Sequence, residues 1–284
     1  MSARLAPDYA NIRAAVSHAL DSREPDDAGR ILGAFYPFLI SHGHLAEVRA
    51  WGEAALEARA RLSEAGLAET LVGAGEIARF AGDLGRAIEL KEELASVHAD
   101  LSRPNWKAAT LADLSEIALD QGDFAAARSY AEQSAEAGMG ARADLCYAEL
   151  ALRKSDLDAA ESRGRVALAG FDEGAFNHAC GLELLGETAR RSGDAALADD
   201  RFRAGLRSFA ALGDGGGIAD CLDAGDGERA SRLLGAAERL RETRGRRPIR
   251  DDVPLHEVSD SARDEGRALS LDEALEYALR RAPA

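Results

Sequence analysis

The sequence predicts an all-α fold of about six stacked helix pairs, and two observations support this prediction. Of the 284 residues, 46% are apolar and only 5% are aromatic, which favours close-packed helices rich in Ala and Leu. One nine-residue phrase also occurs four times, as GEIARFAGD at 75–83, SEIALDQGD at 115–123, AELALRKSD at 148–156 and GETARRSGD at 186–194. Self-similarity at a period of roughly 20–50 residues indicates an array of stacked units rather than one globule.

Each copy of the phrase combines a close helix contact with a turn. A small residue precedes an Ala by three positions, so both lie on one helical face and allow a second helix to approach. Four residues after that Ala comes a Gly-Asp or Ser-Asp pair. The first residue suits the left-handed conformation that ends a helix, and the Asp suits the start of the next one. These pairs are Gly82-Asp83, Gly122-Asp123, Ser155-Asp156 and Gly193-Asp194.

The same register extends along the chain. A second-helix Ala follows each turn, and two degenerate turns are expected at 42–44, with Val48 in the Ala position, and at 225–226, with Ala230 there. The predicted helix pairs are about 25–58, 66–99, 104–137, 141–170, 174–211 and 215–243. We expect flanking helices at about 8–20 and 271–281, the latter started by a capping box of Ser270 and Glu273. This organisation predicts a single domain over 1–284, with an N-terminal helix in 1–24, repeats over 25–243, and a loop and capping helix over 244–284.

The pattern of small residue, Gly-Asp turn and later Ala resembles the tetratricopeptide repeat. The resemblance implies a right-handed solenoid whose concave face is lined by the first helix of each pair. A narrower resemblance is carried by NIRAAVSHALD at 11–21, HGHLAEVRAWGEAAL at 42–56, ERASRLLGAAERLRE at 228–242 and EGRALSLDEALEYAL at 265–279. These segments look like the C-terminal helical region of large ATP-binding LuxR-type actinobacterial regulators. That resemblance implies a sensor and scaffold arm. The sequence departs from the family's pattern at 218–224, which leaves only a short first helix for the sixth pair.

Composition and motifs argue against several function classes. The net charge of −15 disfavours a dominant nucleic-acid surface, and the longest apolar run, ILGAFYPFLI at 31–40, is too short to span a bilayer. Three scattered cysteines show no metal-ligand spacing, and a reducing cytoplasm fits them best. We therefore expect a cytoplasmic, non-enzymatic protein with no cofactor and no metal, and with no direct contact to nucleic acid or membrane.

For four weaker motifs we favour a structural role over a binding or catalytic one. The glycine-rich stretch GDGGGIADC at 213–221 lacks the lysine and hydroxyl of a P-loop and is predicted to be a flexible corner between repeats. His42 and His44 are expected on a solvated turn, with a metal site as the less favoured alternative. The arginines of RLRETRGRRPIR at 239–250 are expected to offset the negative end of a helix dipole, with a phosphate or RNA contact as the alternative. The stripe of Phe202, Leu206 and Phe209 is expected to be core.

The second residue of every repeated phrase is Glu. It follows the small residue directly, so it lies about 100° around the helix from the packed face, towards the expected concave side. One interpretation is a solvated row, or a row that pairs with neighbouring repeats; the other is a groove for a protein or peptide partner, or for a small polar effector. Arginines three or four residues later add charge of the opposite sign. The candidate partner-binding residues are Glu76, Arg79, Glu116, Glu149, Arg153, Glu187, Arg190 and Arg191.

Overall fold

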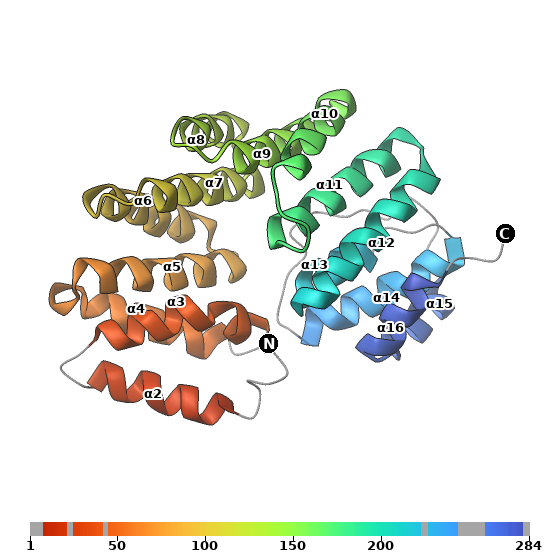
Figure 1. Ribbon diagram of the computed structural model, residues 1–284. Helices are drawn as coiled ribbons and strands as arrows, with labels where there is room; N and C mark the ends of the chain where they lie inside the picture. Colours follow the sequence, from red (N-terminus) through yellow and green to blue (C-terminus); the bar gives the residue numbers. More distant parts are fainter. Residues whose placement is uncertain (1–7, 22–24, 42–44, 223–226, 244–258, 281–284) are drawn as a thin grey trace. The chain divides into compact units, whose positions relative to one another are not determined.

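The protein is all-α, with consecutive helices packed as pairs in a solenoid-like fold, as the sequence predicts (Figure 1). The computed structural model describes residues 8–21, 25–41, 45–222, 227–243 and 259–280. Fifteen α-helices, one short 3-10 helix and no strand occur within these ranges. None of the helices in this part of the chain is both long enough and apolar enough to cross a bilayer.

The described residues form two compact units. The single domain that the sequence predicts over 1–284 stays a prediction. The first unit ends at Cys146, and the second begins at Tyr147, so the boundary falls within one helix. Each unit is described by itself below.

The first unit is a run of helices in which each α-helix from α2 to α7 packs against the next α-helix. Its helices are α2 (Tyr9–Asp21), α3 (Asp26–Ser41), α4 (Leu45–Glu57), η2 (Arg59–Arg61), α5 (Glu64–Phe80), α6 (Leu84–Asp100), α7 (Pro104–Asp120), α8 (Phe124–Glu136) and the first half of α9 (Gly140–Arg153). The first helices of two successive pairs, α3 and α5, also contact each other directly. Leu71, Leu94 and Ile117 come from three consecutive helices and are buried, so the core continues from one pair to the next.

The second unit contains further helix pairs and ends with two short helices. Its helices are the second half of α9, α10 (Leu157–Ala169), α11 (Phe176–Ser192), α12 (Ala195–Leu212), α13 (Gly215–Leu222), α14 (Gly227–Thr243), α15 (Asp260–Arg267) and α16 (Leu271–Leu279). Phe202, Leu206 and Phe209 are buried in one cluster with residues of α13, α14 and α16, which confirms that this stripe is core. The first helix of the sixth pair, α13, has only eight residues, as expected.

The turns follow the predicted chemistry. Gly82, Gly122 and Gly193 have positive φ, and Ser155 adopts the same conformation with φ 60°. The Asp after each of these residues caps the next helix by accepting a hydrogen bond from a backbone N–H. The capping box that starts α16 is also present. The predicted turns at 42–44 and 225–226 lie outside the described residues.

The structure differs from the prediction at α15. The sequence predicts a loop from 245 to 264, but α15 begins at Asp260 after its N-cap Ser259. Its eight residues, DSARDEGR, lack the apolar spacing that identifies a helix in sequence. Two glycines instead let α15 lie directly on α14: a Cβ on Gly235 would lie 1.9 Å from the Arg263 carbonyl oxygen, and one on Gly266 would lie 1.8 Å from the Arg232 carbonyl oxygen.

Candidate functional site

The candidate functional site is a network of ion pairs that joins α5, α6, α7 and the start of α9. At its centre is Lys91 on α6, whose side chain is only 2% exposed. The Lys91 Nζ lies 2.5 Å from Glu76 Oε1 on α5 and 2.9 Å from Asp113 Oδ2 on α7. A buried ammonium group is tolerated when carboxylates surround it in this way.

The network continues along α7. Arg142 Nη2 lies 2.7 Å from both Asp113 Oδ1 and Glu116 Oε1. Arg79 Nη1 lies 3.1 Å from Glu116 Oε2, and Arg79 Nη2 lies 3.1 Å from Asp120 Oδ2. We call these seven residues the α7 charge network: Glu76, Arg79, Lys91, Asp113, Glu116, Asp120 and Arg142. Its four carboxylates and three cations leave a net charge of −1.

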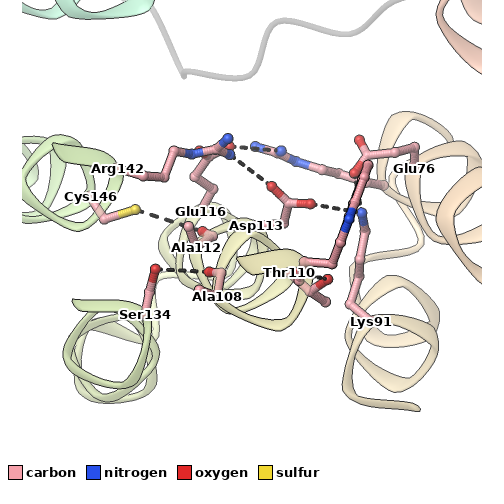
Figure 2. Close-up of polar contacts among 12 residues, drawn as sticks. Glu76, Lys91, Ala108, Thr110, Ala112, Asp113, Glu116, Ser134, Arg142 and Cys146 are labelled. Atoms are coloured by element: carbon pink, nitrogen blue, oxygen red, sulfur yellow. Dashed lines mark hydrogen bonds and ion pairs between the residues drawn. The ribbon is translucent and has the colours of Figure 1, made fainter. Parts of the chain in front are cut away.

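Helix periodicity places the network on one side of α7. Asp113, Glu116 and Asp120 are three, four and seven residues apart, which is the spacing of one helical face. Figure 2 shows Asp113 and Glu116 on the side of α7 that meets Arg142 and Glu76, while Ser134 is bonded to the Ala108 carbonyl on a different side. The first helices α5, α7 and α9 therefore contribute six of the seven side chains.

The small residue of the repeated phrase makes room for the buried lysine. A Cβ on Gly75 would lie 3.1 Å from Lys91 Cε and 3.3 Å from Lys91 Cγ, so the lysine stem runs over the backbone of α5 at this glycine. At the same position of the next repeat, the Ser115 hydroxyl donates to the Ala127 carbonyl oxygen at 2.8 Å. The small residues thus do serve close helix contacts, although different atoms fill the space in each repeat.

The cations of the network hold the Asp113 carboxylate in its ionised form. Burial alone would raise the pKa of Asp113, but the charges of Lys91 and Arg142 outweigh it and lower that pKa below its usual value. Burial alone would likewise lower the pKa of Lys91, but Asp113 and Glu76 raise it instead. Burial and the neighbouring charge of Glu76 raise the pKa of Tyr36 on α3 to about 12.

In the second unit, the predicted Glu and Arg residues pair within their own helices. Arg153 Nε lies 2.9 Å from Glu149 Oε1 on α9. On α11, Arg190 Nη2 and Arg191 Nε each lie 2.6 Å from Glu187 Oε1. Glu187 is buried, which by itself would raise its pKa, but the hydrogen bonds from the two arginines lower it.

The eight predicted residues lie at three places along the chain. Glu76, Arg79 and Glu116 belong to the α7 charge network, in which Arg79 pairs with Glu116 from the neighbouring repeat. Glu149 and Arg153 form an ion pair on α9, and Glu187 pairs with two arginines on α11, of which Arg191 also donates to the Leu152 carbonyl oxygen of α9 at 3.2 Å. The sequence analysis missed Lys91, Asp113, Asp120 and Arg142. The available signal for Lys91 was its position four residues after Ala87, within the buried stripe of α6.

The weaker motifs contribute no further site. Gly213 ends α12 with φ 72°, and Asp214 accepts a hydrogen bond from Gly217 N at 2.8 Å, so the stretch predicted to be a flexible corner is a capped helix start. His42, His44 and residues 244–250 of the arginine-rich segment lie outside the described residues. No cluster of potential metal ligands occurs in the ranges that the structure describes. Burial raises the pKa of Cys146 to about 12, which keeps this thiol unreactive.

Comparisons with known proteins support the fold. No protein-family model and no curated protein matches the chain. Among solved structures, the crystal structure of BtubC (BKLC) from P. vanneervenii is similar, with a TM-score of 0.52 and 17% sequence identity over 72% of this chain and 90% of that chain. A likeness at this identity shows a shared helical architecture and nothing about function.

Proposed function

We propose that this chain is a non-catalytic module that binds a protein or peptide partner through the face that carries the α7 charge network. The observation that carries the proposal is the composition of this face: charges of both signs lie together, with one carboxylate in excess. Glu116 keeps 29% of its side chain exposed while bridging two arginines, so this carboxylate is not fully withdrawn from solvent. Helix-pair repeats commonly recognise extended segments on such faces.

The chemistry of the network suits recognition more than catalysis. A general base works best when its pKa lies near the working pH, whereas the cations beside Asp113 move its pKa in the opposite direction. Carboxylates that stay ionised can instead form charge-assisted hydrogen bonds with a lysine or arginine of the partner. The net charge of −15 favours a partner that is not a polyanion.

A small polar effector is the second candidate, and the mixed charge of the network favours it. Carboxylates and guanidinium groups separated by single ion-pair distances suit a ligand that carries both charges. In this version the chain is an effector-sensing arm related to LuxR-type regulators and acts in transcriptional or signalling regulation in the cytoplasm. An isolated pocket that closes around a ligand would favour the effector, and an open face would favour the peptide.

The experiment compares two glutamates with the same exposure. The native host lysate is passed over the immobilised chain, the retained partner is identified, and its affinity is measured by calorimetry for the Glu116→Gln variant. We expect a loss of about 1–3 kcal/mol, because a charge-assisted hydrogen bond is lost.

The matched control is Glu161→Gln. Glu161 is also 29% exposed and also bridges two arginines, Arg165 and Arg201, but it lies on the second helix of its pair. The control variant is expected to bind the partner as the unaltered chain does. Unchanged affinity of folded Glu116→Gln, or an equal loss in both variants, would reduce the network to a structural role.

A further inference from the structure

The start of α7 differs from the helix starts that carry the repeated turn. Helices α6, α8, α10 and α12 are each capped by an aspartate, namely Asp83, Asp123, Asp156 and Asp194. At α7 the N-cap residue is Arg103, which makes no side-chain cap hydrogen bond, and Pro104 follows it. The positive end of the α7 dipole therefore lies beside a cation, where a carboxylate would be the stabilising group.

The same helix start carries an exposed tryptophan and a second cation. Trp106 is 61% exposed, the most exposed of the large apolar side chains that the structure describes. Lys107 is the next residue, and neither Arg103 nor Lys107 forms an ion pair within the described residues. An exposed tryptophan next to cations without a counter-charge is typical of the anchor residues of an interface.

A buried histidine without hydrogen bonds lies directly behind this surface. His98, near the end of α6, is 3% exposed, and neither of its ring nitrogens has a hydrogen-bond partner within the described part of the chain. Its ring centroid lies 6.0 Å from that of Trp106, and its carbonyl oxygen accepts a hydrogen bond from Arg103 N at 2.8 Å. Burial, followed by the charges of Arg103 and Lys91, lowers the pKa of His98. The surroundings of this imidazole therefore contain positive charge that an incoming anion would offset.

The start of α11 provides an internal comparison. Its N-cap Ala175 also makes no side-chain hydrogen bond, Phe176 is also exposed, and His178 Nδ1 is also buried without a partner among the described residues. The nearby charges differ, however: Asp172 and Glu173 precede Ala175, whereas the start of α7 has two cations and a single acidic residue, Asp100, before them. The two helix starts share an exposed aromatic ring and a histidine but differ in the sign of the nearby charge, so of these two only α7 suits an anionic ligand.

We propose that the start of α7 binds an acidic segment of a partner protein. A carboxylate of that segment lies against Arg103, Lys107 and the backbone N–H groups of Asn105 and Trp106, since Pro104 has none, and an adjacent apolar side chain packs on Trp106. The exposed ring favours a peptide over a free anion, because a small anion would leave Trp106 uncovered. This site uses none of the carboxylates of the α7 charge network, so it stands or falls independently of the function proposed above.

The binding test uses a short synthetic peptide of alternating Glu and Leu and the full chain labelled with 5-fluorotryptophan. The chain contains two tryptophans, and the buried Trp51 serves as the internal reference. We expect the fluorine resonance of Trp106 to shift saturably while that of Trp51 stays in place. A peptide with Gln in place of Glu is expected to produce no saturable shift.

Charge variants test the two cations. Arg103→Gln combined with Lys107→Gln is expected to weaken peptide binding at least tenfold. The matched control combines Arg128→Gln with Arg207→Gln, which removes two exposed cations elsewhere and changes the net charge equally. Equal weakening in both double variants would overturn the proposal, because the effect would then come from net charge alone.

Aromatic variants are compared by the anisotropy of a dye-labelled peptide. Trp106→Ala is expected to weaken binding at least tenfold, and Phe176→Ala at the start of α11 is expected to leave it unchanged. Inorganic phosphate and acetate are titrated separately. If either anion reproduces the full Trp106 shift and displaces the peptide, the site binds small anions and the peptide proposal is wrong. A Trp106 shift that depends on protein concentration without peptide would assign the surface to a second copy and also refute it.

The pH dependence gives a readout that a purely structural role of His98 would not affect. The charged groups around His98 are Lys91 on α6, with its partners Glu76 on α5 and Asp113 on α7, and Arg103 on the turn. A bound carboxylate favours the protonated imidazole, so we expect peptide affinity to rise at least threefold from pH 7.5 to pH 6. His98→Phe should abolish this rise and retain binding at pH 7.5. A rise that persists in His98→Phe would refute the placement of the carboxylate.

Discussion

Replacing the buried lysine of the α7 charge network is expected to destabilise the first unit strongly. In Lys91→Met the stem that runs over Gly75 keeps its approximate shape, but the ammonium group is lost. Glu76 then remains buried without its 2.5 Å partner, while Asp113 keeps Arg142 at 2.7 Å. Removing one partner of a buried ion pair typically costs about 3–5 kcal/mol, because an uncompensated charge stays in a low-dielectric environment.

Urea unfolding followed by tryptophan fluorescence is a suitable assay. Trp51 and Trp106 are the two tryptophans of the chain, and both belong to the first unit, so fluorescence reports on the unit that contains Lys91. With a urea dependence of about 1–3 kcal/mol per molar, the expected loss lowers the unfolding midpoint by at least about 1 M. Adding Glu76→Gln to Lys91→Met should restore part of the loss, because the buried charge is then removed together with its partner.

The control is Arg86→Met on the same helix. Arg86 is 35% exposed and pairs with Glu53 at 3.5 Å and with Glu89 at 3.2 Å. Exposed pairs of this kind contribute about 0–1 kcal/mol, so the midpoint should hardly move. If Lys91→Met is no more destabilising than Arg86→Met, the network does not depend on its buried centre, and our account of it is wrong.

Three further predictions concern pH and the turns. The folded pKa of Glu187 lies below its usual value, so the stability that its charge contributes is present above about pH 4.5 and is lost as the pH falls through the folded pKa. In urea unfolding between pH 3 and 7, we expect Glu187→Gln to be about 1–3 kcal/mol less stable than the unaltered chain at pH 7 and less sensitive to acid. The folded pKa of His98 is also lowered, so the stability of the neutral form is lost as the pH falls below about 6.5, and His98→Phe should flatten the stability profile between pH 7 and 5 in the same assay. Gly122 has φ 78°, and a Cβ added there would meet no atom within 4 Å, so Gly122→Ala should cost about 1–2 kcal/mol of stability through backbone conformation alone. Ser155→Gly removes the side chain from a residue with φ 60° and should stabilise the chain in thermal unfolding. Equal effects of these two turn substitutions would contradict the backbone explanation.

The fold was largely predictable because its signals are local. A Gly-Asp turn specifies both the left-handed end of one helix and the cap of the next, so α5 ends at Phe80 and α6 begins at Leu84 within the predicted pair 66–99. The start of α15 was not predictable in this way. Its contact with α14 depends on two glycines, Gly235 and Gly266, that lie 31 residues apart in sequence and carry no periodic apolar pattern.

The candidate site was only partly predictable because it depends on the register between helices. The repeat places Glu76 and Glu116 at equivalent positions, but their partners are set by how α6 and α7 lie against each other. Lys91 and Asp113 are each eleven residues from Ser102, and His98 and Trp106 are each four residues from it, so both contacts follow from one antiparallel register centred on this residue. Ser102 has φ 54°, the turn conformation that Gly adopts elsewhere in the chain, yet no Gly-Asp pair marks it in the sequence. An error of one residue in the centre of this turn would rotate the predicted partner by about 100° around the helix and move it away from the contact between α6 and α7. Because no sequence signal marks this turn, neither the contacts of the lysine at the centre of the charge network nor those of the histidine behind Trp106 could be predicted.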